Sequence, residues 1–109
     1  MKVKDLKDYF KVINEGDTER EIGGVFCCDL LSIAMGKAPA DSAWVTVMAN
    51  INTLAVASLT DVACVVLAEG ASLDEATLKK AAEQEINVFA SSEHIFETAL
   101  KINGLKDNG

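Results

Sequence analysis

The side chains that could do chemistry in this 109-residue chain follow directly after its short apolar runs. The candidates for binding a small ligand are Asp29, Asn50, Asn52 and Thr53. In open α/β sheets, ligands bind outside the carboxyl ends of the strands, where these polar side chains are expected to lie. The same residue types also cap helices, because their oxygens accept the free backbone N–H groups of the first turn. Capping is therefore the competing interpretation for each of them.

Cys27 and Cys28 are a second possible site, for redox chemistry or a metal. Neighbouring side chains of a strand point to opposite faces, so these two thiols cannot easily hold one ion together. A thiol between a strand end and a helix start can have a lowered pKa, which leaves Cys28 open as a reactive group. Buried packing is the favoured interpretation, because cysteine is among the most buried residue types. Metal-ligand spacings such as Cys-x-x-Cys are missing, so we predict no metal site and no cofactor.

Catalytic signatures are lacking in the sequence. His94 is the only histidine, and it stands in the first turn of the last predicted helix, where a surface or capping role is favoured. The pair Gly23-Gly24 lacks the spacing of a phosphate-binding loop or of a dinucleotide-binding motif. A nucleophile elbow is also missing. We therefore predict that the protein is not an enzyme.

The composition is that of a folded domain with an acidic surface. Half of the residues are hydrophobic, and 17 acidic residues against 10 basic ones give a formal net charge of −7. Such a charge repels phosphate backbones and anionic lipids, so we expect no nucleic-acid partner and no membrane partner. The apolar runs are too short to span a membrane, and the N-terminus lacks the apolar block of a secretory signal. With three cysteines that form no disulfide framework, these features predict a cytoplasmic protein.

The elements that position these residues alternate along the chain. Apolar runs predict strands at 25–28, 44–48, 63–67 and 87–90, with a short edge strand at 12–13. Helices are predicted at 3–11, 30–37, 53–59, 72–85 and from residue 91 or 92 to a stop at Gly104. Strand–helix units repeated in this way predict an α/β fold with a mainly parallel central sheet of about four to five strands, flanked by helices. We expect one compact domain over 1–109, with its core at about 3–105 and a frayed tail at 106–109.

The helix caps are predicted from the residues before each helix. Asp29 is expected to cap the helix at 30–37, and Asn50 or Asn52 the helix at 53–59. Ser72, with Glu75 three residues later, matches a capping box for the next helix. The last helix is expected to begin with a cap at Ser91 or Ser92, and its apolar residues recur at helical spacing: Ile95, Phe96, Ala99, Leu100 and Ile102.

Two predicted helices carry apolar side chains on almost every side. In the helix at 30–37 these are Leu30, Leu31, Ile33, Ala34 and Met35. In the helix at 53–59 they are Leu54, Val56, Ala57 and Leu59. A domain of this size has little interior in which to cover such helices completely. We therefore predict that the protein forms a homodimer.

The segment Ile22 to Ser32 resembles the opening of a DRTGG domain. The run Trp44 to Asn52 and the segment Val65 to Gly70 resemble the two central strands of that family and their loops, and the resemblance covers about residues 3–105. It implies a stand-alone α/β module similar to the N-terminal domain of HPr kinase/phosphorylase, with a regulatory or dimerising role rather than a catalytic one. The Asp-Arg and Thr-Gly-Gly pieces of the family fall near Asn50-Ile51 and at Ala68 to Gly70, so both are altered in this chain.

The sequence thus favours a non-catalytic regulatory or scaffold domain that acts by homodimerisation and protein–protein interaction. One alternative is a sensor of a small molecule, for which a nucleotide is a candidate, with Asp29, Asn50, Asn52 and Thr53 as the ligand-binding residues. The other alternative is a redox- or metal-linked accessory protein that uses Cys27 and Cys28.

Overall fold

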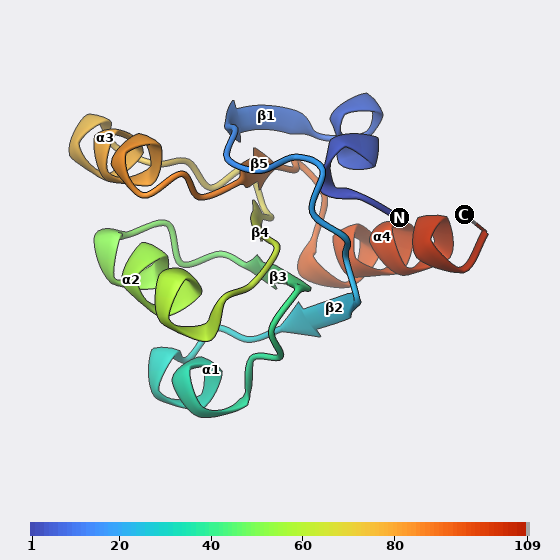
Figure 1. The fold of residues 1–109 in the computed structure, drawn as a ribbon, viewed down its shortest axis with the longest axis horizontal. Coiled ribbons are helices and arrows are strands. Elements are labelled where there is room, and N and C mark those ends of the chain that lie inside the picture. Colours follow the sequence, from blue (N-terminus) through green and yellow to red (C-terminus); the bar gives the residue numbers. More distant parts are fainter. Residues whose placement is uncertain (109) are drawn as a thin grey trace.

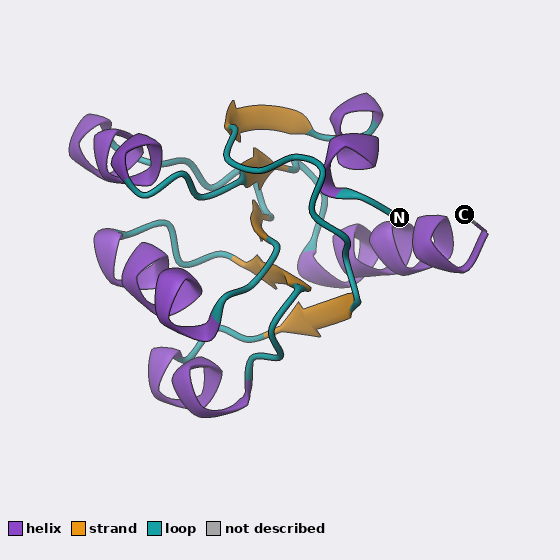
Figure 2. Ribbon diagram, in the orientation of Figure 1, coloured by secondary structure: helices purple, strands orange, loops and turns teal. Residues whose placement is uncertain are grey.

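The computed structural model describes residues 1–108, which form one sheet between two layers of helices (Figures 1 and 2). The bounds of the helices and strands are η1 (Val3–Asp8), β1 (Lys11–Asn14), β2 (Gly24–Cys27), α1 (Leu31–Lys37), β3 (Ser42–Thr46), α2 (Ile51–Thr60), β4 (Cys64–Leu67), α3 (Glu75–Glu83), β5 (Val88–Ala90) and α4 (Ile95–Asn108). Strands and helices alternate from β2 onward, as the sequence predicts, whereas the helix predicted at 3–11 is a 3₁₀ helix that ends at Asp8 and is followed directly by strand β1. The predicted α/β fold with a mainly parallel sheet is confirmed.

The sheet has five strands in the order β1-β5-β4-β3-β2. Strands β2 to β5 are parallel neighbours, and β1 pairs antiparallel with β5. Helices α1, α2 and α3 cover one face, and η1 and α4 cover the other (Figure 1). The chain therefore turns toward one face after β2, β3 and β4, and toward the opposite face after β5. Strands β1 and β2 are the two edges of the sheet.

The core consists of two apolar clusters, one on each face of the sheet. Val66 and Phe89 belong to the cluster under η1 and α4, and Val65 and Val88 belong to the cluster under α1, α2 and α3. This alternation follows from the two-residue period of a strand. Strands β3 and β4 are buried at every position, which agrees with their uncharged and mostly apolar sequences. Trp44 is fully buried, and its indole Nε1 donates to the Cys28 carbonyl at 3.0 Å.

The helix starts agree with the predicted caps only in part. Asn50 caps α2, as predicted, by accepting a hydrogen bond from the Thr53 N–H at 3.1 Å. The prediction for Asp29 is wrong, because the N-cap of α1 is Leu30, which makes no side-chain cap bond. The N-cap of α3 is Asp74 rather than Ser72, and its carboxylate accepts from the Thr77 N–H at 2.8 Å. A sequence with several capping residues in a row does not say which one has extended backbone before the first turn.

The last helix extends beyond its predicted stop. Helix α4 runs through Gly104 to Asn108, so the prediction that Gly104 ends it is wrong. Leu105 still packs against the buried cluster that contains Phe89 and Ile102, and this contact accounts for the added turn. The predicted frayed tail at 106–109 is thus helical to Asn108, and residue 109 lies outside the described residues. None of the helices in the described part of the chain has the length and apolarity needed to cross a membrane.

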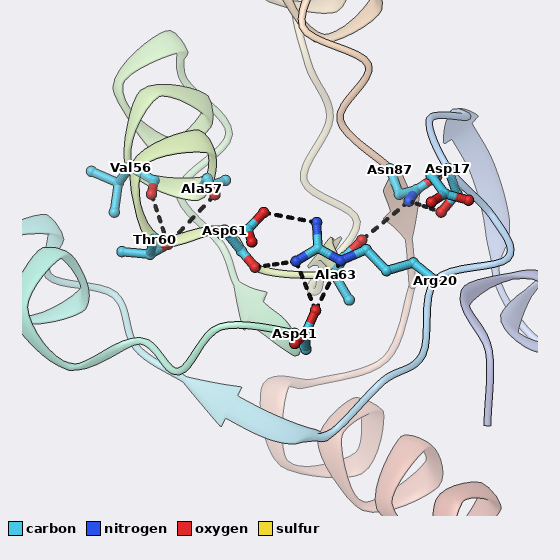
Figure 3. A network of polar contacts seen from close by, with 9 residues as sticks. All are labelled: Asp17, Arg20, Asp41, Val56, Ala57, Thr60, Asp61, Ala63 and Asn87. Carbon is cyan, nitrogen blue, oxygen red and sulfur yellow. Dashed lines mark hydrogen bonds and ion pairs between the residues drawn. The ribbon is translucent and has the colours of Figure 1, made fainter.

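Arg20 ties together three connections at the amino-terminal ends of the strands (Figure 3). Its Nε and Nη2 donate to Asp41 Oδ1 at 3.0 and 2.8 Å, and its Nη1 lies 2.9 Å from Asp61 Oδ1. Nη2 also donates to the Asp61 carbonyl. Both aspartates adopt left-handed backbone conformations, with φ of 63° and 59°. The guanidinium thereby holds the turns before β3 and β4 against the loop before β2.

Asn87 holds the loop after β1 against the sheet (Figure 3). Its amide Nδ2 donates to the carbonyls of Asp17 at 2.9 Å and Ala63 at 3.1 Å, and its Oδ1 accepts from the Gly16 N–H at 2.7 Å. The side chain is buried, so these bonds replace the water that its amide would otherwise contact. They join the edge strand β1 to the parallel part of the sheet.

Candidate functional site

Three of the predicted ligand-binding residues are engaged in internal hydrogen bonds at the carboxyl ends of β2 and β3. Asp29 Oδ1 accepts from the Thr46 hydroxyl at 2.7 Å and from the Val47 N–H at 2.9 Å. Asn50 caps α2, and Thr53 is buried beneath that cap. These contacts join the end of β2 to the end of β3 and then start α2. Asp29 and Asn50 are therefore already engaged in internal hydrogen bonds, although only Asn50 caps a helix.

Asn52, the fourth predicted residue, lies exposed in the first turn of α2. None of the three cavities described for residues 1–108 is lined by any of the predicted ligand residues. The structure thus places all of them at the same end of the sheet, outside these three cavities. Their role in ligand binding stays a prediction.

The three cysteines lie in different surroundings. Cys27 is exposed on β2, Cys28 packs beside Trp44 and donates to the Leu30 carbonyl, and Cys64 is fully buried in β4. Burial raises the pKa of the Cys64 thiol to about 12, and partial burial, together with the charge of Asp29, raises the pKa of Cys27. A raised pKa keeps a thiol protonated and less nucleophilic. Within residues 1–108, no three His, Cys, Asp or Glu side chains gather closely enough to hold a metal ion.

An exposed ion pair joins the loops that follow β4 and β5. His94 Nδ1 lies 2.8 Å from Glu69 Oε1. The hydrogen bond with Glu69 is the main cause that raises the pKa of His94 above its ordinary value of 6.5, and the charges of Glu69 and Glu97 add to it. Glu69 also has a left-handed backbone, with φ of 61°. The loop after β4 is therefore held by a contact that depends on the protonation of a histidine.

The contact between His94 and Glu69 predicts how the stability of the fold depends on pH. Because the pKa of His94 is higher in the folded state, the pair stabilises the fold fully below pH 6.5 and loses its effect as the pH rises through the raised value. An NMR titration of the histidine ring in Glu69→Gln should give a lower pKa than in the wild type. Glu83→Gln, on the exposed side of α3, is the control and should leave the pKa unchanged. Equal pKa values in the wild type and Glu69→Gln would show that the pair does not form in solution.

Apolar side chains are exposed around the open edge of the sheet. Strand β2 lies at that edge, with the outermost helix α1 on one side and α4 on the other (Figure 1). We call this region the β2 edge surface, and it consists of Cys27, Leu30, Ile33, Met35, Phe96 and Leu100. Phe96 is 67% exposed and Leu100 is 57% exposed, although both belong to the apolar residues that recur at helical spacing in the sequence. The covered face of α4 is formed instead by Ile95, Thr98, Ala99 and Ile102.

A family comparison decides what kind of domain carries this surface. The family model described as the DRTGG domain matches residues 11–105, which is nearly the whole chain. The chain belongs to the DRTGG domain family. This confirms the resemblance seen in the sequence, and it places the protein among regulatory-type domains. No curated protein matches the chain significantly.

Two features of this DRTGG domain were not predicted from its sequence. The exposure of Phe96 and Leu100 depends on the rotation of α4 about its axis. The spacing of the residues could have indicated this exposure. Residues 95, 98, 99 and 102 form one stripe along a helix, and residues 96 and 100 form another. The second feature is a cavity between β1 and the loops after β4 and β5, and it includes Tyr9 and Lys11. No local pattern marks that cavity, because its walls come from three distant segments.

Proposed function

We propose that this DRTGG domain is a non-catalytic regulatory or scaffold domain that forms a homodimer through the β2 edge surface. The observation that carries the proposal is a set of exposed apolar side chains around an open edge strand. Among residues 1–108, strand β2 pairs only with β3. The outer side of such a strand presents unpaired backbone groups, which pair readily with a strand of another molecule. Two copies of β2 can pair across a twofold axis and extend the sheet.

The side chains beside β2 also favour a second copy of the chain as the partner. Leu30, Ile33 and Met35 on α1 are each about half exposed, at 55%, 45% and 52%. Phe96 and Leu100 stand one helical turn apart on the outward side of α4. Burying large apolar side chains of this kind contributes about 25 cal/mol per Å² of apolar surface, from which the entropic cost of association must be subtracted. A second copy of the chain would cover both helices when the two edge strands meet.

The distribution of charge explains why the contact would form at this edge. The whole chain carries a net charge of −7, so two copies repel each other over most of their surfaces. The segment 22–36, which contains β2 and most of α1, has Asp29 as its one charged residue. The Asp29 carboxylate is already bonded to Thr46 and Val47. Approach along this edge therefore carries little electrostatic cost.

The size of the domain is compatible with such an interface. A specific interface of standard size takes about 800 Å² from each partner. The domain exposes 5587 Å² in total, of which that area is about one seventh. The polar groups at the ends of β2 and β3 bond internally, which leaves them less available for catalysis.

Sedimentation velocity across a range of concentrations tests the proposal. We expect the wild type to sediment as a dimer at tens of micromolar. Phe96→Glu and Ile33→Glu each place a charge in the proposed contact and should shift the protein to a monomer. Leu59→Glu is the matched control, because Leu59 is 69% exposed on α2, outside the β2 edge surface.

Two results would refute this interface. One is a wild type that stays monomeric at about 100 μM, a concentration at which even a weak specific dimer is populated. The other is dissociation by Leu59→Glu with no effect of Phe96→Glu or Ile33→Glu. Circular dichroism spectra should confirm that each variant is folded, so that a monomer reflects the loss of the contact.

A further inference from the structure

The connections that follow the neighbouring strands β4 and β5 run to opposite faces of the sheet. The loop after β4 leads to α3 on one face, and the loop after β5 leads to α4 on the other (Figure 1). Where neighbouring connections diverge in this way, a crevice opens at the carboxyl ends of the strands, and ligands bind in it. A cavity of about 400 Å³ lies here, lined by residues 9–11, 13, 70–72 and 90–93. Its size falls in the range of small-molecule sites, about 300 to 1,000 Å³.

The charge available in this cavity is positive. Lys11 at the start of β1 forms no ion pair with the described side chains, and its ammonium is exposed. The one carboxylate in the wall, Glu93, is already paired with Lys101. Lys101 also lies over the Phe10 ring, with its Nζ 5.8 Å from the ring centroid. An anion entering the cavity therefore meets an unpaired ammonium and a carboxylate that is already neutralised.

The remaining groups of the cavity suit a ligand with an anionic head and an apolar body. The hydroxyls of Tyr9, Ser72 and Ser92 make no hydrogen bond with the described residues and can donate to an anion. The Ser91 hydroxyl, in contrast, is occupied by Thr98 and by the Glu93 N–H. Apolar contacts are available from Phe10, Ile13, Ala71 and Ala90. Binding sites commonly combine an apolar lining with a few polar groups that orient the ligand.

We propose that this cavity binds a small organic anion, with Lys11 contacting its carboxylate or phosphate group and Phe10 and Ile13 contacting its apolar part. The site differs from the one predicted at Asp29 and Asn50. It lies beside β1, at the edge of the sheet opposite to β2. The proposal is therefore independent of the dimer contact, and either can fail without the other.

NMR titration of the ¹⁵N-labelled full chain tests the site with phenyl phosphate and benzoate as probes. We expect saturable shifts of the amides at 70–72 and 90–93 with at least one probe. Lys11→Met should weaken that binding by about fivefold, the effect of losing one exposed charge pair. Lys79→Met is the matched control, since Lys79 is an exposed lysine of α3 that makes no ion pair with the described residues, and it should bind like the wild type.

The two probes also distinguish the anion. Tighter binding of phenyl phosphate assigns the site to a phosphate-bearing ligand, and tighter binding of benzoate assigns it to a carboxylate. Benzyl alcohol has the ring without the charge and should bind more weakly than either. The proposal is overturned if no amide shifts at probe concentrations up to about 20 mM, which is well above the Kd of a weak site. Shifts confined to other residues, or unchanged binding in Lys11→Met, would overturn it equally.

Discussion

Replacing Gly16 with alanine is expected to lower the free energy of unfolding by about 3 kcal/mol or more, as severe overpacking does. A Cβ at this position would lie 1.8 Å from the Glu85 carbonyl oxygen and 2.6 Å from its carbon. These are backbone atoms, so no side-chain rotation can relieve the clash. The loop must move away, and the 2.7 Å hydrogen bond from the Gly16 N–H to Asn87 is then lost. Chemical denaturation followed by the fluorescence of Trp44 measures the change.

Gly36→Ala is the matched control for this substitution. A Cβ at Gly36 meets nothing within 4 Å, and the residue lies inside α1. Alanine is favoured over glycine in a helix by up to about 1 kcal/mol, so this variant should be as stable as the wild type or slightly more stable. Similar denaturation midpoints for the two variants would show that the loop does not contact Glu85 as described.

Asn87→Ala is expected to lower the free energy of unfolding by about 3 kcal/mol, because a buried polar group left without its partner costs about 1 to 3 kcal/mol. The substitution removes the partners of the Gly16 N–H and of the carbonyls of Asp17 and Ala63. Thermal or chemical denaturation measures the loss. Asn103→Ala is the control, since Asn103 is exposed and bonds only to Asp107 at 3.4 Å. That variant should stay within about 0.5 kcal/mol of the wild type.

The variant Asn87→Asp separates the lost hydrogen bonds from the lost volume. A carboxylate keeps the acceptor for the Gly16 N–H, but it places a negative charge against the carbonyl oxygens of Asp17 and Ala63. The pKa of this carboxyl group would be raised in the folded state, so the folded protein gains stability relative to the unfolded chain as the pH falls. The stability deficit against the wild type should therefore shrink between pH 7 and pH 5. A deficit that does not change with pH would contradict the bonding of Asn87.

The alternation of elements and the central position of two strands could be predicted from the sequence. Strands β3 and β4 read as uncharged and mostly apolar runs, and the structure buries both completely. A run of this kind has no face that tolerates water, so it must lie inside a sheet covered on both sides. The cap at Asn50 is equally local, because the capped N–H belongs to Thr53, three residues along the chain.

The candidate sites depended on contacts between distant residues. Asp29 was predicted to cap the helix that follows it, yet it bonds to Thr46 and Val47, which lie 17 and 18 residues away. A carboxylate can accept either kind of N–H, and only the parallel pairing of β2 with β3 decides between them. Gly16 is a similar case. The Glu85 carbonyl leaves no room for a larger residue there, and nothing in the sequence near Gly16 indicates this contact.

The sequence by itself determined the α/β class, the order of the elements, the buried central strands and the family, because each depends on residues close together in the chain. The tertiary structure decided the rotation of α4 on the sheet, where Lys11 lies and which two strands form the edges of the sheet. Phe96 and Ile95 are neighbours in sequence and almost equally apolar, yet one is exposed and the other partly covered. Their difference comes from the rotation at which α4 packs on β2 and β3, and that rotation is set by the sum of contacts over the whole domain.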